Sequence, residues 1–519
     1  MSDTGPVPSS RRLASDTTPQ PPPWVVMAVV AFGVFVAADD LMVVATMLRP
    51  MIADFDLVVP DDLDDAAWIV NVYLIAYIAV MPLAGRLSDV LGRRAVFIGA
   101  LAIFGFGSIV VPAASSLAML LVGRVLTAVG GGALVPVALA VAGDLYTGRR
   151  RARALGLLGA IETIGWVWGP LYGAVLVRFL TWQWQFHLNI PLALAGMVVG
   201  WRVLDPTSRA SRQVDWLGAG LLTVGLVALN VGLLNEARIQ TVTGLDQLRD
   251  QGGGLGSVGG LWLYGVAAVA LAGFVWHERR ASEPLVSPEL VMQRSVGAAL
   301  GVNALIGVGL VIALINVPLF VNIVEGGLQE SAVRAGWLLT ALTATMAVTS
   351  YVGGLASGRF GYRGPTLVGL GLGAAGLLMV GATWAPDTGG VTMAVQLGLV
   401  GAGIGLILAP ASAVVVDASA DSQRGTAAGL VIMARLIGFS IGLAALTAWG
   451  LHRYDVLRHQ VELPSITDPG FADAVTEATI GLSTSALTET FTGAAIALIV
   501  ALPLALLLRS SDPSEVVER

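Results

Sequence analysis

The sequence predicts an all-α protein that crosses a membrane many times and contains two helical bundles of one design. Of its 519 residues, 55% are hydrophobic and 12% are charged, about half the charged fraction of a soluble globular protein. Apolar runs long enough to cross about 30 Å of hydrocarbon recur along the whole chain. A ten-residue link at 85–94, G-R-L-S-D-V-L-G-R-R, returns in weaker form at 354–363 as G-L-A-S-G-R-F-G-Y-R.

Fourteen apolar runs are candidate membrane spans, because length is the deciding signal where a segment is apolar on every face. Residues 1–23 form a polar, proline-rich tail that we expect to be disordered, and the first span is retained, since no small-residue cleavage site follows it. Residues 509–519 form a second tail. The spans begin near Trp24, Ala67, Ala95, Leu117, Ala154, Leu188, Trp216, Leu261, Ser295, Ala335, Thr366, Val391, Ala427 and Thr490.

The spans divide into two six-helix bundles, at 24–201 and 295–508, joined by a linker at 202–294 that holds two extra transmembrane helices. These extra helices explain why the second copy of the link follows 269 residues after the first, further than six helices require. A long polar stretch at 452–489 precedes the last span, and its flanks can extend both neighbouring helices beyond the bilayer. Links of this size are either functional or disordered.

The charges predict an orientation and exclude several classes of protein. All 29 basic residues are Arg, and most of those in the links fall on one side of the predicted membrane, so the positive-inside rule puts both termini in the cytoplasm. With no Lys, the phosphate-binding loop of ATP-driven pumps cannot be present. With no Cys and four scattered His, we expect neither disulfides nor a metal site.

The link at 85–94 is too short for a soluble domain and reads as a tight turn between two membrane helices. Gly85 and Gly92 let two helix ends approach closely, and Asp89 can accept hydrogen bonds from the free N–H groups of a neighbouring helix end. We expect Arg86, Arg93 and Arg94 to face phospholipid phosphate. The simpler interpretation is an ordinary charged cytoplasmic turn.

Inserting a charged side chain into the membrane costs a few kcal/mol, so such a residue usually has a function there. The charged side chains inside the apolar helices are therefore candidate proton-coupling residues. Asp39 and Asp40 point about 100° apart, so at most one is expected to face the central cavity. Arg435 needs a carboxylate partner, for which Asp40 and Glu162 are available, and an ion pair that breaks on protonation would be a two-state switch. A purely structural pairing is the alternative for each carboxylate.

The fifth span contains a smooth face that also carries a kink. Gly165, Gly169 and Gly173 lie at i, i+4 and i+8, and Pro170 removes a backbone hydrogen bond.

Together these patterns resemble the major facilitator superfamily. The link at 85–94 is similar to the family's gating loop between helices two and three, and 165–173 matches the motif that marks its exporters. The stretches 182–191 and 215–218 resemble the fourteen-helix drug:proton antiporter branch. The resemblance implies outward, proton-coupled transport with no cofactor, and it associates Arg124 with proton coupling. The chain departs from the family's pattern at Gln183, Thr127 and Ala128.

Several stretches are more closely similar to the mycobacterial triacylglyceride exporters, a family that works with a lipid-binding lipoprotein and confers multidrug resistance. In that family the helix-one carboxylate aligns with Asp40 and an Arg of helix eleven with Arg435, whereas its helix-five Glu aligns with Thr163, next to Glu162. The resemblance implies a bacterial inner-membrane location and makes 452–489 a path that leads lipid outward. The similar stretches are 40–49, 68–86, 132–137, 168–173 and 434–454.

The function predicted from the sequence is therefore proton-coupled export of lipids or amphiphilic drugs, and not enzymatic catalysis. A general multidrug:proton antiporter is the first alternative. An importer of the same fold is disfavoured by the pattern at 165–173. A membrane scaffold is disfavoured because Asp40, Arg124, Glu162 and Arg435 would then be costly without purpose.

Overall fold

The structure of the protein is a computed structural model that describes residues 21–55, 63–206, 214–241, 256–281, 284–286, 288–325, 328–461 and 471–509. All regular secondary structure in these residues is helical, as expected. Both predicted tails lie outside them, apart from a few residues. Eleven of the described helices are long and apolar enough to cross a membrane. The predicted number of fourteen spans stays a prediction.

The first bundle begins with two long helices joined to a shorter one by the link at 85–94. A positive φ of 95° at Gly92 separates the second helix from the third, and Gly361, at the same place in the repeated link, has φ 72°. The equivalent turns support two bundles of one design. The bundle consists of α1 (Pro23–Asp54), α2 (Leu63–Leu91), α3 (Arg93–Val110), α4 (Leu117–Leu145), α5 (Gly148–Phe179) and α6 (Gln183–Val203).

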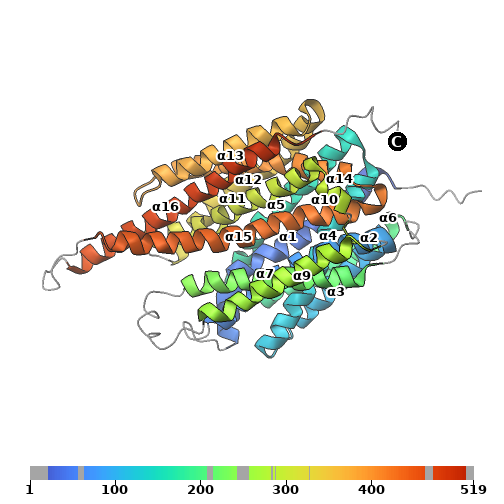
Figure 1. Cartoon of the computed structure of the whole chain (residues 1–519). Coiled ribbons are helices and arrows are strands. Elements are labelled where there is room, and N and C mark those ends of the chain that lie inside the picture. Colours follow the sequence, from blue (N-terminus) through green and yellow to red (C-terminus); the bar gives the residue numbers. More distant parts are fainter. Residues whose placement is uncertain are drawn as a thin grey trace, which may run out of the picture.

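The second bundle packs against the first along two seams, α2 with α15 and α5 with α12. Figure 1 shows the two bundles side by side, with their long helices running in the same general direction. The bundle consists of α11 (Arg294–Glu325), α12 (Leu328–Phe360), α13 (Arg363–Thr383), α14 (Gly390–Ala418), η1 (Asp421–Gln423), α15 (Arg424–Arg458) and α16 (Phe471–Ala505).

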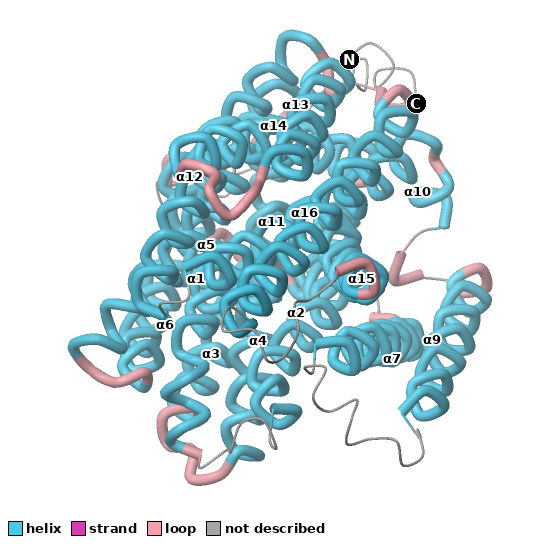
Figure 2. The backbone as a smooth tube through the Cα atoms, turned by 90° about the vertical axis from the view of Figure 1, so that its left-hand side faces the viewer, coloured by secondary structure: helices cyan, strands magenta, loops and turns pink. Residues whose placement is uncertain are grey.

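The linker contributes α7 (Trp216–Thr241), α9 (Gly256–Glu278) and the short α10 (Pro288–Met292). The helices α7 and α9 pack on each other, and α7 also contacts α2 and α15. Figure 2 shows this pair outside the two bundles, beside α15. The predicted extra helices are therefore present as helices, and α7 carries a shorter apolar stretch, Trp216–Gly232.

The described part of the polar stretch at 452–489 is mostly helical. The helix α15 continues to Arg458 and α16 begins at Phe471, well before the span start predicted at Thr490. Figure 1 shows the two helices continuing beyond the rest of the bundle on the left. Arg453 donates two hydrogen bonds to Glu489, at 2.5 and 2.8 Å, and so joins the two extensions.

Candidate functional site

A buried ion pair joins α1 to α4 in the middle of the first bundle. Nη1 of Arg124 lies 3.3 Å from Oδ2 of Asp40, and the two side chains are 1% and 0% exposed. The guanidinium also lies 4.2 Å from the centre of the Tyr73 ring. Asn189 of α6 donates a hydrogen bond to Oδ1 of Asp40 at 3.1 Å. Charge and hydrogen bonds therefore satisfy both oxygens of Asp40, as a buried carboxylate requires.

Asp39, the neighbour of Asp40, is also buried, at 7% exposure. Its Oδ2 accepts a hydrogen bond from Nε2 of Gln185 at 2.9 Å. Sequence reasoning did not single out Gln185 or Asn189 as site residues. Their i, i+4 spacing near the start of α6 could have indicated a site, because it puts two amides on one face of the helix.

A second buried ion pair joins the two bundles. Nη1 of Arg435 lies 3.1 Å from Oε2 of Glu162, and both side chains are at least nine-tenths buried. Of the two carboxylates available to Arg435, the structure therefore selects Glu162 and leaves Asp40 to Arg124. The adjacent Thr163 donates to the carbonyl of Gly159 in its own helix, at 2.8 Å.

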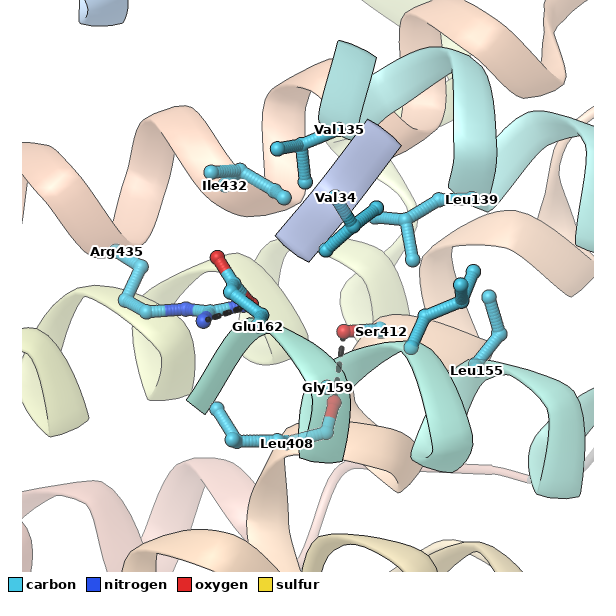
Figure 3. A pocket seen from close by; sticks show the side chains of 11 residues that line it. Val34, Val135, Leu139, Leu155, Gly159, Glu162, Leu408, Ser412, Ile432 and Arg435 are labelled. Carbon is cyan, nitrogen blue, oxygen red and sulfur yellow. Dashed lines mark hydrogen bonds and ion pairs between the residues drawn. The ribbon is translucent and has the colours of Figure 1, made fainter. Parts of the chain in front are cut away.

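The pair of Glu162 and Arg435 lines a small pocket between the bundles (Figure 3). Apart from that pair, Ser412 and Gly159, the lining is aliphatic. Its walls come from α1, α4, α5, α14 and α15: Val34, Val135, Leu139, Leu155, Leu158, Gly159, Glu162, Leu408, Ser412, Ile432 and Arg435.

The glycine face of α5 packs directly on α1. A Cβ at Gly165 would lie 2.7 Å from Cβ of Ala38, and a Cβ at Gly169 would lie 2.8 Å from the carbonyl oxygen of Asp39. Gly173 is buried one turn further on, and Pro170 lies within the same continuous helix. The smooth face predicted from the sequence therefore packs on α1 next to the turn that contains Asp39 and Asp40.

The link at 85–94 binds the first turn of α15. Oδ1 of Asp89 accepts a hydrogen bond from the N–H of Gly425 at 2.9 Å, and Oδ2 accepts one from the N–H of Thr426 at 3.0 Å. A carboxylate at a helix N-terminus is favoured by the free N–H groups and by the helix dipole. A Cβ at Gly85 would lie 2.2 Å from the carbonyl oxygen of Gly425, so this approach needs glycine.

The expectation that the arginines of this link face phospholipid phosphate is wrong for Arg86 and Arg93, which are both buried. Arg93 is buried and pairs with Asp89 at 2.6 Å and Asp144 at 3.0 Å. The guanidinium of Arg94 stacks on the ring of Trp201, 3.9 Å from its centre. Two helix ends pack so closely here that the nearest anions for Arg93 are protein carboxylates.

Further contacts close the same end of the molecule, which we call the loop end because residues 85–94 lie there. Arg151 pairs with Asp417 across the bundles, and Tyr362 donates a hydrogen bond to the same carboxylate. Burial raises the pKa of Tyr362 well above its ordinary value. Arg424 pairs with Asp144 at 3.1 Å. The two bundles are thus tied together at the loop end.

Comparison with known proteins agrees with this architecture. Residues 30–443 match the model of the Major Facilitator Superfamily. A triacylglyceride transporter of Mycolicibacterium hassiacum is 36% identical over 82% of this chain and 78% of its own length. Triacylglyceride transporters of Mycolicibacterium smegmatis and Mycobacterium tuberculosis are each 34% identical over 82% of this chain, covering 75% and 82% of their own lengths.

Solved structures share the fold at low sequence identity. The human organic anion transporter MFSD10 has a TM-score of 0.63 at 15% identity, covering 94% of this chain and all of its own. A proton:xylose symporter has a TM-score of 0.59 at 12% identity, covering 91% and 94%. The matched family model, the curated relatives and the fold lead to one conclusion: this chain belongs to the major facilitator superfamily and is a multi-span membrane transporter, not an enzyme.

Proposed function

We propose that this protein is a proton-coupled exporter of triacylglyceride-like lipids in a bacterial inner membrane. The observation that carries the proposal is the ion pair between Glu162 and Arg435, because it ties one bundle to the other beside a largely aliphatic pocket. Transporters of this superfamily draw on ion gradients and need no bound cofactor. A proton is a ready trigger for such a pair, since protonating the carboxylate removes the charge that holds the guanidinium.

The proposed cycle uses the two buried pairs in turn. With the loop end closed, protons reach Asp40 and Glu162 from the opposite side of the membrane. Neutral Glu162 releases Arg435, and neutral Asp40 releases Arg124, so that the bundles can rock about the seams. The loop end then opens by breaking the contacts of Asp89 with α15. Protons leave to the cytoplasm as cargo enters, and re-formed ion pairs return the molecule to its first state.

A lipid cargo is favoured over a general drug cargo by the relatives named triacylglyceride transporters. The lining of the small pocket is largely aliphatic, and this chemistry does not distinguish a lipid from an amphiphilic drug. The extended ends of α15 and α16 give such a cargo a path beyond the bilayer, and a lipid-binding lipoprotein is the partner that would receive it. A multidrug:proton antiporter is the second candidate.

The proposal also includes the number of spans, the cytoplasmic termini and the export motif of α5. Fourteen spans, with α5, α7 and α9 added to the eleven, would leave both termini on one side of the membrane, and the arginines of the links favour the cytoplasmic side. The packing of Gly165 and Gly169 on α1 supports an export role for that motif, because it links the helix that carries Glu162 to the helix that carries Asp40.

The test uses purified protein in liposomes with an imposed pH gradient. Movement of a fluorescent triacylglyceride analogue and of a cationic dye is compared between wild type and Asp40→Asn, with the exposed Asp387→Asn as matched control. Gradient-driven lipid movement that only Asp40→Asn abolishes supports the proposal. Movement of the dye alone makes the protein a drug antiporter, and unchanged lipid movement in Asp40→Asn removes Asp40 from the proton path.

A further inference from the structure

Asp39 is a buried carboxylate that the cycle above leaves unused. Its Oδ2 accepts a hydrogen bond from Nε2 of Gln185 at 2.9 Å. Within the described residues, neither Oδ1 of Asp39 nor Oε1 of Gln185 has a hydrogen-bond partner, although both are buried. Two side chains that already touch therefore each hold an acceptor without a donor. An unmet buried polar atom costs about 1–3 kcal/mol.

The charges around Asp39 favour its neutral form when Asp40 is ionised. Arg124 directs Nη1 to Asp40 and Nε to the carbonyl of Ile69, at 3.3 and 3.4 Å, and neither contact goes to Asp39. Two adjacent carboxylates beside one guanidinium would leave a net negative charge in the protein interior, which costs several kcal/mol. In the described chain, the other titratable group that faces Asp39 is Tyr172 of α5, and it is no cation.

A proton on Asp39 provides the hydrogen that this contact lacks. The protonated acid can donate to the amide oxygen of Gln185 while its other oxygen keeps the hydrogen bond from Nε2. Gln185 in turn donates to Asn189 at 3.5 Å, and Asn189 donates to Asp40 at 3.1 Å. This chain of amides couples the two carboxylates, so that protonation of one affects the other.

The route that we infer for the proton begins where Asp39 faces α5. A Cβ at Gly169 would lie 3.4 Å from Oδ1, so at this position only the glycine backbone of α5 faces the buried oxygen. One turn along α5, away from the loop end, Tyr172 is half-buried and stacks on the exposed Trp168, with ring centres 6.1 Å apart. This face of α5 leads from Asp39 towards the end of the molecule opposite the loop end.

We propose that Asp39 is a second proton-binding site, separate from Asp40, which loads a proton from the side opposite the loop end and releases it when α1 and α5 separate. On release, the carboxylic acid of Asp39 becomes a carboxylate and a free proton, and no other bond changes. The inference rests on the proposed function, and it adds one proton to each transport cycle. Gln185 is the positioning residue that holds the acid in place.

The first test detects the proton directly and needs no transport. Infrared difference spectra of the detergent-purified protein, recorded between mildly acidic and alkaline pH, report the carbonyl stretch of buried protonated carboxylic acids. We expect a protonated-acid band in wild type and in Asp387→Asn, and a smaller band in Asp39→Asn, because Glu278 contributes to the band in all three. A band of equal size in Asp39→Asn overturns the proposal. Asn resembles the neutral acid in shape, so this variant should fold, and thermal unfolding checks it.

The second test measures the proton:cargo ratio in liposomes from the pH gradient at which net lipid movement stops. We expect Asp39→Asn to transport with a ratio lower by one proton than wild type, and therefore to accumulate less cargo at the same gradient. An unchanged ratio overturns the inference and leaves the proposed exporter intact. Lipid movement in wild type that does not depend on the pH gradient overturns the proposed function instead. The infrared band then still reports whether Asp39 is protonated.

Discussion

Arg435 donates a hydrogen bond to Glu162 at 3.1 Å, and this contact joins α15 of the second bundle to α5 of the first. Removing one partner of a buried pair leaves the other charge uncompensated. We therefore expect Arg435→Gln and Glu162→Gln each to lower the free energy of unfolding by about 3–5 kcal/mol.

The double variant should be more stable than either single variant and should still fail to transport, because a neutral pair cannot switch with protonation. Thermal unfolding in detergent and gradient-driven transport in liposomes measure the two effects. Transport that survives in Arg435→Gln would remove this pair from the mechanism.

Gly85 is the position at which the loop end tolerates no side chain. In Gly85→Ala the added Cβ would meet the carbonyl oxygen of Gly425 at 2.2 Å, so α2 and α15 must separate. Overpacking of this kind costs about 1–3 kcal/mol, which shifts the closed-to-open ratio roughly 5- to 150-fold.

The shift can be measured with a single cysteine, because the chain has none of its own. Ser412→Cys places a buried thiol in the central pocket. In the Gly85→Ala background it should react faster with a membrane-impermeant reagent added at the loop end. Gly99→Ala, where a Cβ meets nothing within 4 Å, is the control and should leave the rate unchanged. Equal rates in both backgrounds would contradict the tight approach at Gly85.

Gly169 packs α5 on the backbone of α1 beside Asp39. In Gly169→Ala a Cβ would lie 2.8 Å from the carbonyl oxygen of Asp39 and 3.0 Å from the N–H nitrogen of Val43. We expect a loss of stability of about 1–3 kcal/mol and slower transport, because α1 must move away from α5. Gly220→Ala in α7, with open space around its Cβ, is the matched control. Wild-type transport in Gly169→Ala would show that α5 adjusts without cost.

Glu278 follows the apolar part of α9, and we expect it to make the packing of the linker depend on pH. Its carboxylate accepts hydrogen bonds from the N–H groups of Leu285 and Val286, at 3.2 and 3.3 Å, whose side chains pack against α7 and Leu430. Burial raises the pKa of Glu278 from 4.5 to about 7. An acid with a raised pKa stabilises the folded form below its ordinary pKa, and that stability falls as pH rises towards 7.

We expect the free energy with which residues 285 and 286 pack against α7 to weaken by about 1–2 kcal/mol from pH 5 to pH 8. Hydrogen exchange of their backbone N–H groups, corrected for its intrinsic pH dependence, measures this change. Glu278→Gln should remove most of this slope. His277 is the neighbouring residue in α9 and pairs with Asp215 at 2.8 Å, so His277→Gln is the control. A slope that persists in Glu278→Gln and disappears in His277→Gln would assign it to the histidine.

The helical membrane fold, the repeated bundle and the charged residues inside the membrane helices could all be predicted from the sequence. Hydropathy over 20 residues and the cost of a buried charge are local properties, so they can be read without a structure. That Asp89 accepts hydrogen bonds from a neighbouring helix end was also predicted from the sequence, and the structure identifies this end as the start of α15.

Which of the charged side chains form ion pairs depends on how the helices pack. Segments that are apolar on every face carry no periodicity, so nothing in them says how each helix is rotated about its axis. That rotation pairs Arg124 with Asp40 and Arg435 with Glu162, and it buries Asp39 against Gln185. It also turns Arg93 towards protein carboxylates and away from lipid, since helix ends that are distant in sequence meet at the loop end.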